Sequence, residues 1–504
     1  MTPEPIKGKI KTKKITLISL YGHLLNIGSR QISSYLKEQG HKVNLLFLPL
    51  DDRNPKNFSK RTFSPELLNE VKEFCKDSDV IGISLMSGHL KAAIQITNLL
   101  DNKKVVWGGI HPTVCPEECM KYTNILCIGE GEEAMLDFIN NPEKTDIPNF
   151  WFKKNGKIIK NEVRCLNADL DRFPDPDYDL TTHYISSNNK IISLTKEIMK
   201  QMAWIEAGLI KHYVLTSRGC PHSCTFCSNS LLQNIYKNKG PFLRKRSIER
   251  VIGEMEFIKK EFPYIGSMGI MDETFFLRTA DEIKHFSELY KEKIGLPLQV
   301  EFSPGTFSEE KFKYMVDAGL KGIQMGVQTI SDRVNYEVFK RYQKRETVEN
   351  IVKVMDKYKN KLDFCHFHFI THNPFETKEE FKETIRFALN LPKGFYIGRF
   401  PLKYFPGIQL RESAKEKGFL NEINTDTFGW LDIRQFKDAD YLNYLFVFLA
   451  SLKNRNIINP YSKTKAKPFI DFLLTPFFVK LVDRPFILKP TYLLFSKMQK
   501  TQDF

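Results

Sequence analysis

The stretch that decides the fold is Cys220-Pro221-His222-Ser223-Cys224-Thr225-Phe226-Cys227, with the spacing C-x3-C-x2-C. Three thiolates this close in sequence can wrap one face of a cubane iron–sulfur cluster and leave its fourth iron open. An open metal position can bind a substrate directly, as it does in catalytic metal sites. The alternative is structural zinc with His222 as the fourth ligand, but such ligands usually come in separated pairs, and no second cysteine pair lies nearby.

Around this loop, apolar strand patterns alternate with amphipathic helical patterns. The predicted strands are 213–216, 268–271, 299–302, 322–327, 364–370 and 396–402, and the predicted helices are 248–260, 280–293, 309–318, 348–358, 378–389 and 410–417. Short strands that alternate with helices indicate parallel βα units. Six units predict a partial (β/α)6 barrel over residues 206–420, with its site at the carboxyl ends of the strands, where the cysteine loop falls.

The N-terminal stretch repeats this alternation on a smaller scale. Strand patterns occur at 15–20, 43–48, 80–85, 105–108 and 125–128. They predict an α/β, doubly wound, Rossmann-like domain over residues 1–149, in which a ligand binds at the carboxyl edge of the sheet. Residues 150–205 interrupt the pattern with a hairpin turn at Asn155-Gly156 and a proline-stiffened crossing at 173–177, and they are predicted to be a linker. Residues 421–504 predict a helical C-terminal region.

Composition limits the classes of protein to consider. The chain has 504 residues, 42% of them hydrophobic, and a formal net charge of +15, which describes an ordinary globular protein with a basic surface. No nucleic-acid recognition module is visible, so we expect no nucleic-acid partner. Nine cysteines, no secretory leader and no run long enough to cross a bilayer indicate a cytoplasmic protein. The apolar segments 441–452 and 469–482 either cap the barrel or lie on a membrane surface.

The cysteine loop resembles that of the radical S-adenosylmethionine (SAM) superfamily, C-x3-C-x-aromatic-C, with Phe226 at the aromatic position. The resemblance implies that Cys220, Cys224 and Cys227 hold a [4Fe–4S] cluster whose open iron chelates SAM. It also implies an electron donor, such as flavodoxin or ferredoxin, and cleavage of SAM to methionine and a 5′-deoxyadenosyl radical.

Three other segments of the barrel resemble the same superfamily. Residues 269–274 resemble the segment that contacts the SAM amino group, with Asp272 and Glu273 as candidates, although mid-barrel carboxylates can also serve as loop caps. Residues 322–328 resemble the strand near the SAM adenine and ribose, although its usual Glu is Gln328 here. Residues 373–377 resemble the turn after the fifth strand, with a predicted capping box between Thr377 and Glu380.

The N-terminal domain resembles that of the cobalamin-binding, class B methylase-like subfamily. The resemblance rests on 107–113 and on Gly129-Glu130-Gly131-Glu132, and it implies cobalamin-binding residues at Gly108, Gly109, His111, Gly129, Glu130 and Gly131. Glycines without a Cβ let a large flat ligand approach the backbone, but they can also simply form tight βα turns. His23 lacks the Asp and Gly of the cobalt-binding motif D-x-H-x-x-G, so we do not expect it to coordinate cobalt.

Cysteines and histidines outside the loop have competing interpretations. Cys115-x3-Cys119 has the spacing of a second cluster, but buried packing of free cysteines is favoured there. His366 and His368 share one face of a barrel strand and either line the substrate cavity or pack in the core.

The predicted function is therefore cobalamin-dependent radical SAM C-methylation of an unactivated carbon. The Phe-rich, basic C-terminal third favours an apolar small-molecule substrate, such as a lipid, isoprenoid or tetrapyrrole, and peripheral membrane contact. The alternatives are a radical cyclase or rearrangement enzyme without methyl transfer, and a non-enzymatic iron–sulfur or corrinoid-binding protein.

Overall fold

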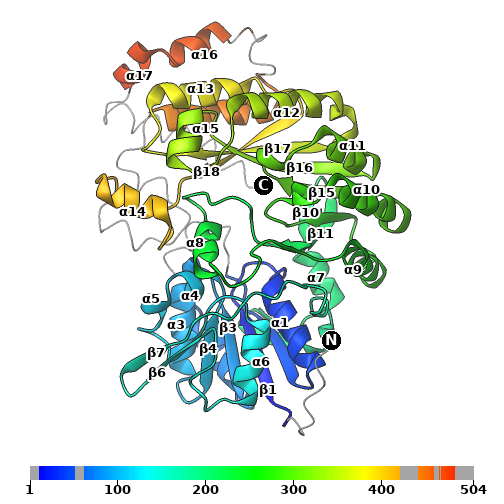
Figure 1. Cartoon of the computed structure of the whole chain (residues 1–504), viewed down its shortest axis with the longest axis vertical. Helices are drawn as coiled ribbons and strands as arrows, with labels where there is room; N and C mark the ends of the chain where they lie inside the picture. Colours follow the sequence, from blue (N-terminus) through cyan, green and yellow to red (C-terminus); the bar gives the residue numbers. More distant parts are fainter. Residues whose placement is uncertain (1–10, 51–61, 421–440, 459–464, 466, 483–504) are drawn as a thin grey trace.

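The computed structural model describes residues 11–50, 62–420, 441–458, 465 and 467–482. It contains two large sheets, one from the N-terminal part and one from the barrel part, with α8 (Ser228–Ile235) lying between them (Figure 1). Much of the predicted C-terminal region lies outside the described residues.

The N-terminal sheet is doubly wound. Its strand order is β7-β6-β5-β4-β3-β1-β2-β8-β9, and its parallel centre consists of β1 (Lys14–Ser19), β2 (Lys42–Phe47), β3 (Val80–Ser84), β4 (Lys104–Gly108) and β5 (Ile125–Cys127). Separate apolar cores lie on its two faces, one with α1 (Ile27–Glu38) and α6 (Glu132–Asn140), the other with α2 (Pro65–Phe74) and α3 (Leu90–Leu99). Because β2 and β3 flank β1, the topological switch point lies between β1 and β3, where a ligand crevice forms.

Residues 150–205 are more than a linker. They add two antiparallel hairpins to the N-terminal sheet: β6 (Phe150–Lys154) with β7 (Lys157–Lys160), and β8 (His183–Ser187) with β9 (Lys190–Ser193). The hairpins cover its two outer strands, β5 and β2, which would otherwise expose unpaired backbone groups. The stretch between the hairpins contacts the barrel, where Arg246 forms a 2.8 Å ion pair with Asp175, and the segment after β9 contacts it through a 2.6 Å ion pair of Lys196 with Glu261.

The barrel is an open, curled sheet with strand order β10-β11-β14-β15-β16-β17-β18. The short β10 (Trp204–Glu206) is antiparallel to β11, and the other six strands are parallel: β11 (Leu209–Val214), β14 (Ser267–Ile270), β15 (Leu298–Phe302), β16 (Leu320–Gln328), β17 (Phe364–Thr371) and β18 (Phe395–Pro401). Its outer helices are α9 (Ile248–Glu261), α10 (Ala280–Leu289), α11 (Glu309–Asp317), α12 (Arg345–Lys357) and α13 (Lys378–Leu389), whereas α14 (Gln409–Glu416) packs through Leu410 near Phe226 of the cysteine loop. The capping box of Thr377 and Glu380 is present at the start of α13, which confirms that prediction.

The described C-terminal helices pack on the barrel, since side chains of all three belong to its apolar core. α15 (Tyr441–Asn454) packs on α13 and β18, and the Asn454 side chain forms hydrogen bonds of 2.8 and 3.0 Å with the backbone of Ile397. It therefore caps the edge strand of the barrel. α16 (Lys467–Leu473) and α17 (Pro476–Val482) lie at the far end (Figure 1) and expose Phe469, Phe472 and Phe477. Within the described residues, none of the helices has the length and hydropathy needed to cross a membrane.

Candidate active site

The cysteine loop is held rigidly at the carboxyl end of the first barrel strands. Gly219 has φ +90°, and a Cβ there would collide with the carbonyl oxygen of Phe242, so only glycine fits before Cys220. The Thr225 hydroxyl donates to the carbonyl of Val338 at 2.7 Å, and the Phe226 ring packs edge-to-face on Phe339 with centroids 4.8 Å apart. The aromatic position of the motif thus anchors the loop to the barrel.

The three motif thiols are largely shielded from solvent. Cys220 and Cys224 are buried and Cys227 is half-buried. Burial raises the pKa of all three thiols, that of Cys220 to about 12. A coordinated metal deprotonates a thiol outright, so these residues fit a metal cluster better than a free nucleophile. The Asn229 amide points at Cys227 Sγ at 3.8 Å, the kind of hydrogen bond that tunes a cluster sulfur.

The two adjacent carboxylates of the barrel have different surroundings. Asp272 is buried and accepts hydrogen bonds from the backbone N–H groups of Thr216 at 2.6 Å and Ser217 at 3.1 Å. It therefore ties the base of the cysteine loop to the barrel. Glu273 is surrounded by protein and yet reached by solvent, as expected for a group that lines a concave site, and desolvation raises its pKa despite a hydrogen bond with Asn229. Asn229, which the sequence analysis did not identify, thus contacts both Cys227 and Glu273.

Further polar groups lie along the barrel strands. Burial, helped by the charge of Glu273, raises the pKa of Glu301 on β15 to about 7. Gln328 ends β16 with a left-handed φ of +69°, a conformation that non-glycine residues adopt mainly where function or packing demands it. The side chains of His366 and His368 lie on the opposite face of β17 from Cys365, which packs in the helix-covered core. The two rings are 6.4 Å apart and belong to the barrel interior.

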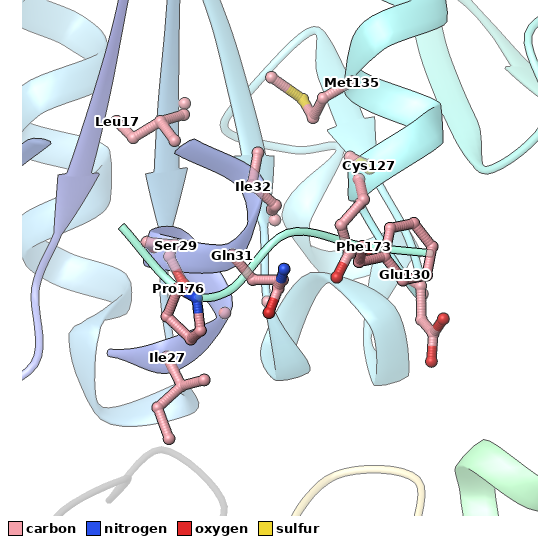
Figure 2. A pocket seen from close by; sticks show the side chains of 18 of the residues that line it. Leu17, Ile27, Ser29, Gln31, Ile32, Cys127, Glu130, Met135, Phe173 and Pro176 are labelled. Carbon is pink, nitrogen blue, oxygen red and sulfur yellow. The ribbon is translucent and has the colours of Figure 1, made fainter. Parts of the chain in front are cut away.

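A second element of the site is a cavity of about 280 Å³ at the switch point of the N-terminal sheet. Figure 2 shows it between Leu17 of β1, Gln31 and Ile32 of α1, and Phe173 and Pro176 of the crossing. The predicted residues Gly108, Gly109, Gly129, Glu130 and Gly131 all line it. The barrel contributes Leu215, Ser217, Arg218 and Arg246, so the cavity lies where the two sheets meet.

The glycines of this crevice differ in how tightly their surroundings hold them. Gly109 has φ +98°, and a Cβ there would lie 3.0 Å from the carbonyl oxygen of Leu85. A Cβ on Gly131 would lie 2.8 Å from the side chain of Ile32. The predicted residue His111 does not line the cavity, because the first turn of α4 (Ile110–Val114) carries it away, and its Nδ1 lies 3.0 Å from Ser87 Oγ. The His23 ring does not line the cavity either.

Two arginines of the barrel join the crevice to the cysteine loop. Arg218 lies 3.1 Å from Glu130 and 2.6 Å from Glu132, and Arg244 also pairs with Glu130. Burial raises the pKa of Glu130, but the hydrogen bonds and charges of Arg244 and Arg218 outweigh it and hold that pKa below its usual range. Sequence analysis missed both arginines, although Arg218 lies only two positions before Cys220.

Comparison with known proteins agrees with this geometry. Residues 214–388 match the radical SAM superfamily, and residues 13–139 match the B12 binding domain. An uncharacterized methyltransferase of Pyrococcus horikoshii is 27% identical over 384 residues, which cover 74% of this chain and 76% of that protein. Cytidylyl-2-hydroxyethylphosphonate methyltransferase of Streptomyces wedmorensis is 22% identical over 373 residues, which cover 65% of this chain and 65% of that protein.

A solved structure shares the overall fold. The radical S-adenosylmethionine methyltransferase TsrM from Kitasatospora setae, with cobalamin and a [4Fe-4S] cluster bound, superposes with a TM-score of 0.60 and 16% identity, covering 81% of this chain and 75% of that chain. The fold and the site therefore define a two-sheet radical enzyme. The chain belongs to the radical SAM superfamily and carries an N-terminal B12-binding domain. It is a radical SAM enzyme of the methyltransferase type that uses a [4Fe–4S] cluster, SAM and cobalamin, which confirms the predicted family, fold class and cofactors.

Proposed function

We propose that this enzyme is a C-methyltransferase that transfers a methyl group to an unactivated carbon of an apolar small molecule. The observation that carries the proposal is the position of Arg218. This residue lines the crevice, pairs with Glu130 and Glu132, and lies two positions before Cys220. A crevice for cobalamin and a loop for the cluster at one interface is the arrangement that a radical methyl transfer requires, because both cofactors must reach the same substrate carbon.

The residues of the chain take the following roles in this proposal. Cys220, Cys224 and Cys227 hold the cluster, and Asn229 orients the Cys227 sulfur. Glu273 receives the SAM amino group, whereas Asp272, whose oxygens already bind Thr216 and Ser217, fixes the loop. Gln328 is assigned to contact the adenosine part of SAM. When bound, the cluster supplies the electron that cleaves SAM, which makes the hydrogen-abstracting radical, and cobalamin supplies the methyl group.

The crevice supports cobalamin through its shape. Its volume of about 280 Å³ is near the lower end of ligand pockets, about 300–1,000 Å³. It therefore fits one branch of a corrinoid, such as the nucleotide tail. Gly108 and Gly109 leave the strand end open to the rest of the ligand, and His111, which lies outside the crevice, is not assigned to cobalamin.

The substrate is proposed to combine an apolar body, as in a lipid, an isoprenoid or a tetrapyrrole, with a polar group. Support for the apolar part comes from exposed aromatic side chains: Phe400 at the end of β18, and the phenylalanines of α16 and α17. Support for the polar part comes from Glu301 and His366 in the barrel interior. An electron donor is needed as for any radical SAM enzyme, and a flavodoxin or ferredoxin is proposed.

Isotope transfer tests the proposal. The anaerobically reconstituted enzyme is supplied with cobalamin, a low-potential reductant, methyl-deuterated SAM, and lipid or tetrapyrrole extracts. We expect 5′-deoxyadenosine and S-adenosylhomocysteine in similar amounts and a deuterated methyl group in one extract component. Cys224→Ala is expected to abolish both 5′-deoxyadenosine and product, and the exposed Cys165→Ala to leave them unchanged. Formation of 5′-deoxyadenosine alone would replace methylation by cyclisation or rearrangement, and absence of both products would favour a non-enzymatic centre.

A further inference from the structure

A second group of metal-ligating side chains lies beside the crevice, just after β4. His111 belongs to α4, Glu118 belongs to α5 (Pro116–Cys119), and Cys115 joins the two helices. One ligand atom of each residue lies within 4.8 Å of the others, and His111 Nε2 is 3.9 Å from a Glu118 carboxylate oxygen. His111 and Cys115 are buried, and Glu118 is half-buried.

We propose that His111, Cys115 and Glu118 bind a divalent cation of the zinc class, at a site distinct from the cluster and from cobalamin. Imidazole nitrogen, thiolate sulfur and carboxylate oxygen are the ligands that Zn²⁺ prefers, at about 2.0–2.3 Å. A neutral imidazole, one thiolate and one carboxylate together balance the charge of the ion, which matters in a buried site. A fourth ligand, such as water, would complete the tetrahedral set that Zn²⁺ prefers.

The surroundings of His111 favour this role. Its Nδ1 lies 3.0 Å from Ser87 Oγ, which orients the ring and directs Nε2 toward Glu118. Metal-binding histidines almost always have such a partner on their other nitrogen. The Cys115 N–H donates to the His111 carbonyl at 2.9 Å, so the backbone turn fixes the spacing of two ligands.

A second iron–sulfur cluster on Cys115 and Cys119 does not fit. Cys119 is fully buried in the apolar core of the N-terminal sheet and does not belong to the group of three ligands. The proposed ion would instead lie near the barrel, because α4 contacts α8 and the charge of Arg411 from α14 reaches Cys115. It would thus fix the turn between α4 and α5, which contacts α8 beside the cysteine loop.

The test uses Co²⁺ as a spectroscopic probe for Zn²⁺. The full-length chain with Cys220, Cys224 and Cys227 all changed to Ala removes the cluster thiols, and no cobalamin is added. We expect one equivalent of Co²⁺ to bind with a thiolate-to-cobalt charge-transfer band that Zn²⁺ bleaches. Cys115→Ala, made in this background, is expected to abolish the band. Cys119→Ala, one helical turn away, is the matched control and is expected to keep it.

Two further measurements keep the proposal falsifiable if Cys115→Ala folds poorly. Glu118→Gln changes a half-buried side chain, and it is expected to weaken Co²⁺ binding at least about tenfold while the circular dichroism spectrum stays native. In the wild-type enzyme with its cluster, mass spectrometry is expected to find one zinc per chain. No band, a band that survives Cys115→Ala, or zinc below 0.1 per chain after zinc loading would overturn the site. Because the cluster is absent from the Co²⁺ experiment, its result is independent of the proposed methyl transfer.

Discussion

The crevice of the N-terminal sheet and the mouth of the barrel lie at the same interface but are lined by different types of residue. Glycines and arginine-paired carboxylates form the crevice, where Arg218 and Arg244 keep Glu130 ionised. Thiols and carboxyls that burial drives toward the neutral form surround the barrel mouth, as at Cys220 and Glu301, whose pKa values rise to about 12 and about 7.

The difference fits the proposal that the crevice binds cobalamin and the barrel mouth binds the cluster and SAM. A large, nearly rigid cofactor is selected by shape, so the crevice needs positions without side chains and a fixed frame. A metal cluster and a charged amino group are selected by ligand chemistry, so the barrel supplies thiols and carboxyls that lose their protons when a cation binds. Cobalamin binding should therefore depend on side-chain volume in the crevice and on the arginine–carboxylate ion pairs that form its frame. Cluster binding and SAM cleavage should depend on the ligands of the barrel and on their protonation.

The largest effect is expected from removing one barrel ligand. Cys224→Ala leaves two of three thiols, and we expect iron and sulfide content and SAM cleavage to fall to background, while cobalamin still binds with wild-type affinity. Iron analysis, the visible spectrum and a cobalamin titration measure these properties together. Loss of cobalamin binding in the same variant would break the separation of the two regions.

The next effect concerns the frame of the crevice. Arg218→Ala leaves Glu132, whose side chain is only 6% exposed, without its partner. Removing one member of a buried pair costs about 3–5 kcal/mol, and we expect about 3 kcal/mol because the Arg218 side chain is 21% exposed. The midpoint temperature of thermal unfolding and the affinity for cobalamin should both decrease.

Lys357→Ala is the matched control for Arg218→Ala. It breaks an ion pair with Glu309 whose partners are 60% and 50% exposed, so a change below about 1 kcal/mol is expected. Arg218→Lys should recover only part of the loss, since lysine cannot hold two carboxylates in a planar fork. Equal stability of Arg218→Ala and Lys357→Ala would show that the arginine frame is unimportant.

The parts of this molecule that sequence predicts well are those with local causes. Strands such as β1, β3 and β17 are apolar runs of the proper length, and their predicted bounds differ from the observed ones by at most one residue at either end. The capping box of α13 and the crevice glycines follow from residue types at fixed spacing. The cluster motif likewise lies within eight consecutive residues.

The missed features depend on distant partners. β8 and β9 are short and mixed in polarity, and their hairpin joins the sheet through the pairing of β8 with β2, which is far away in sequence. Arg218 meets Glu132 across 86 positions, and no local pattern reveals that contact. Neighbouring carboxylates are equally ambiguous, because the bonds to Thr216 and Ser217 decide that Asp272 fixes the loop while Glu273 stays available.

The pH dependence of stability tests the protonation state of a barrel carboxyl, Glu376. Burial, partly offset by hydrogen bonds from Thr329 and Thr384, raises the pKa of Glu376 to about 7. Between its unfolded pKa of about 4.3 and pH 7, the folded state retains a proton that the unfolded state loses, so the free energy of unfolding falls as pH rises. We expect Glu376→Gln to remove about 2 kcal/mol of that decline, allowing for partial exposure, in urea unfolding from pH 5 to 8.

Glu380, four residues later, provides the opposite sign. Burial raises its pKa, but the hydrogen bonds from Arg333 and the Thr377 cap outweigh it, and the pKa falls to about 2. Its stabilising contribution is present above the unfolded pKa and is lost as pH falls toward 2. Glu380→Gln should therefore lower stability at pH 7, where Glu376→Gln raises it. Parallel pH profiles for the two variants would contradict the assignment of a neutral Glu376.

The smallest effect is expected from a matched pair of glycines in the crevice. A Cβ on Gly108 would meet only the carbonyl oxygen of Cys127, at an ordinary 3.7 Å, so Gly108→Ala should fold normally and yet place a methyl group in the crevice. One added carbon in a fitted pocket changes affinity about tenfold, and we expect a loss of this size for cobalamin.

Gly109→Ala adds backbone strain at φ +98°, so it should lower cobalamin affinity and also cost about 1–2 kcal/mol of stability. Equilibrium dialysis and thermal unfolding separate the two effects, and iron content should stay constant in both variants. If Gly108→Ala binds cobalamin like the wild type, shape at this strand end does not select the cofactor, and the contrast between crevice and barrel would have to rest on the arginine frame alone.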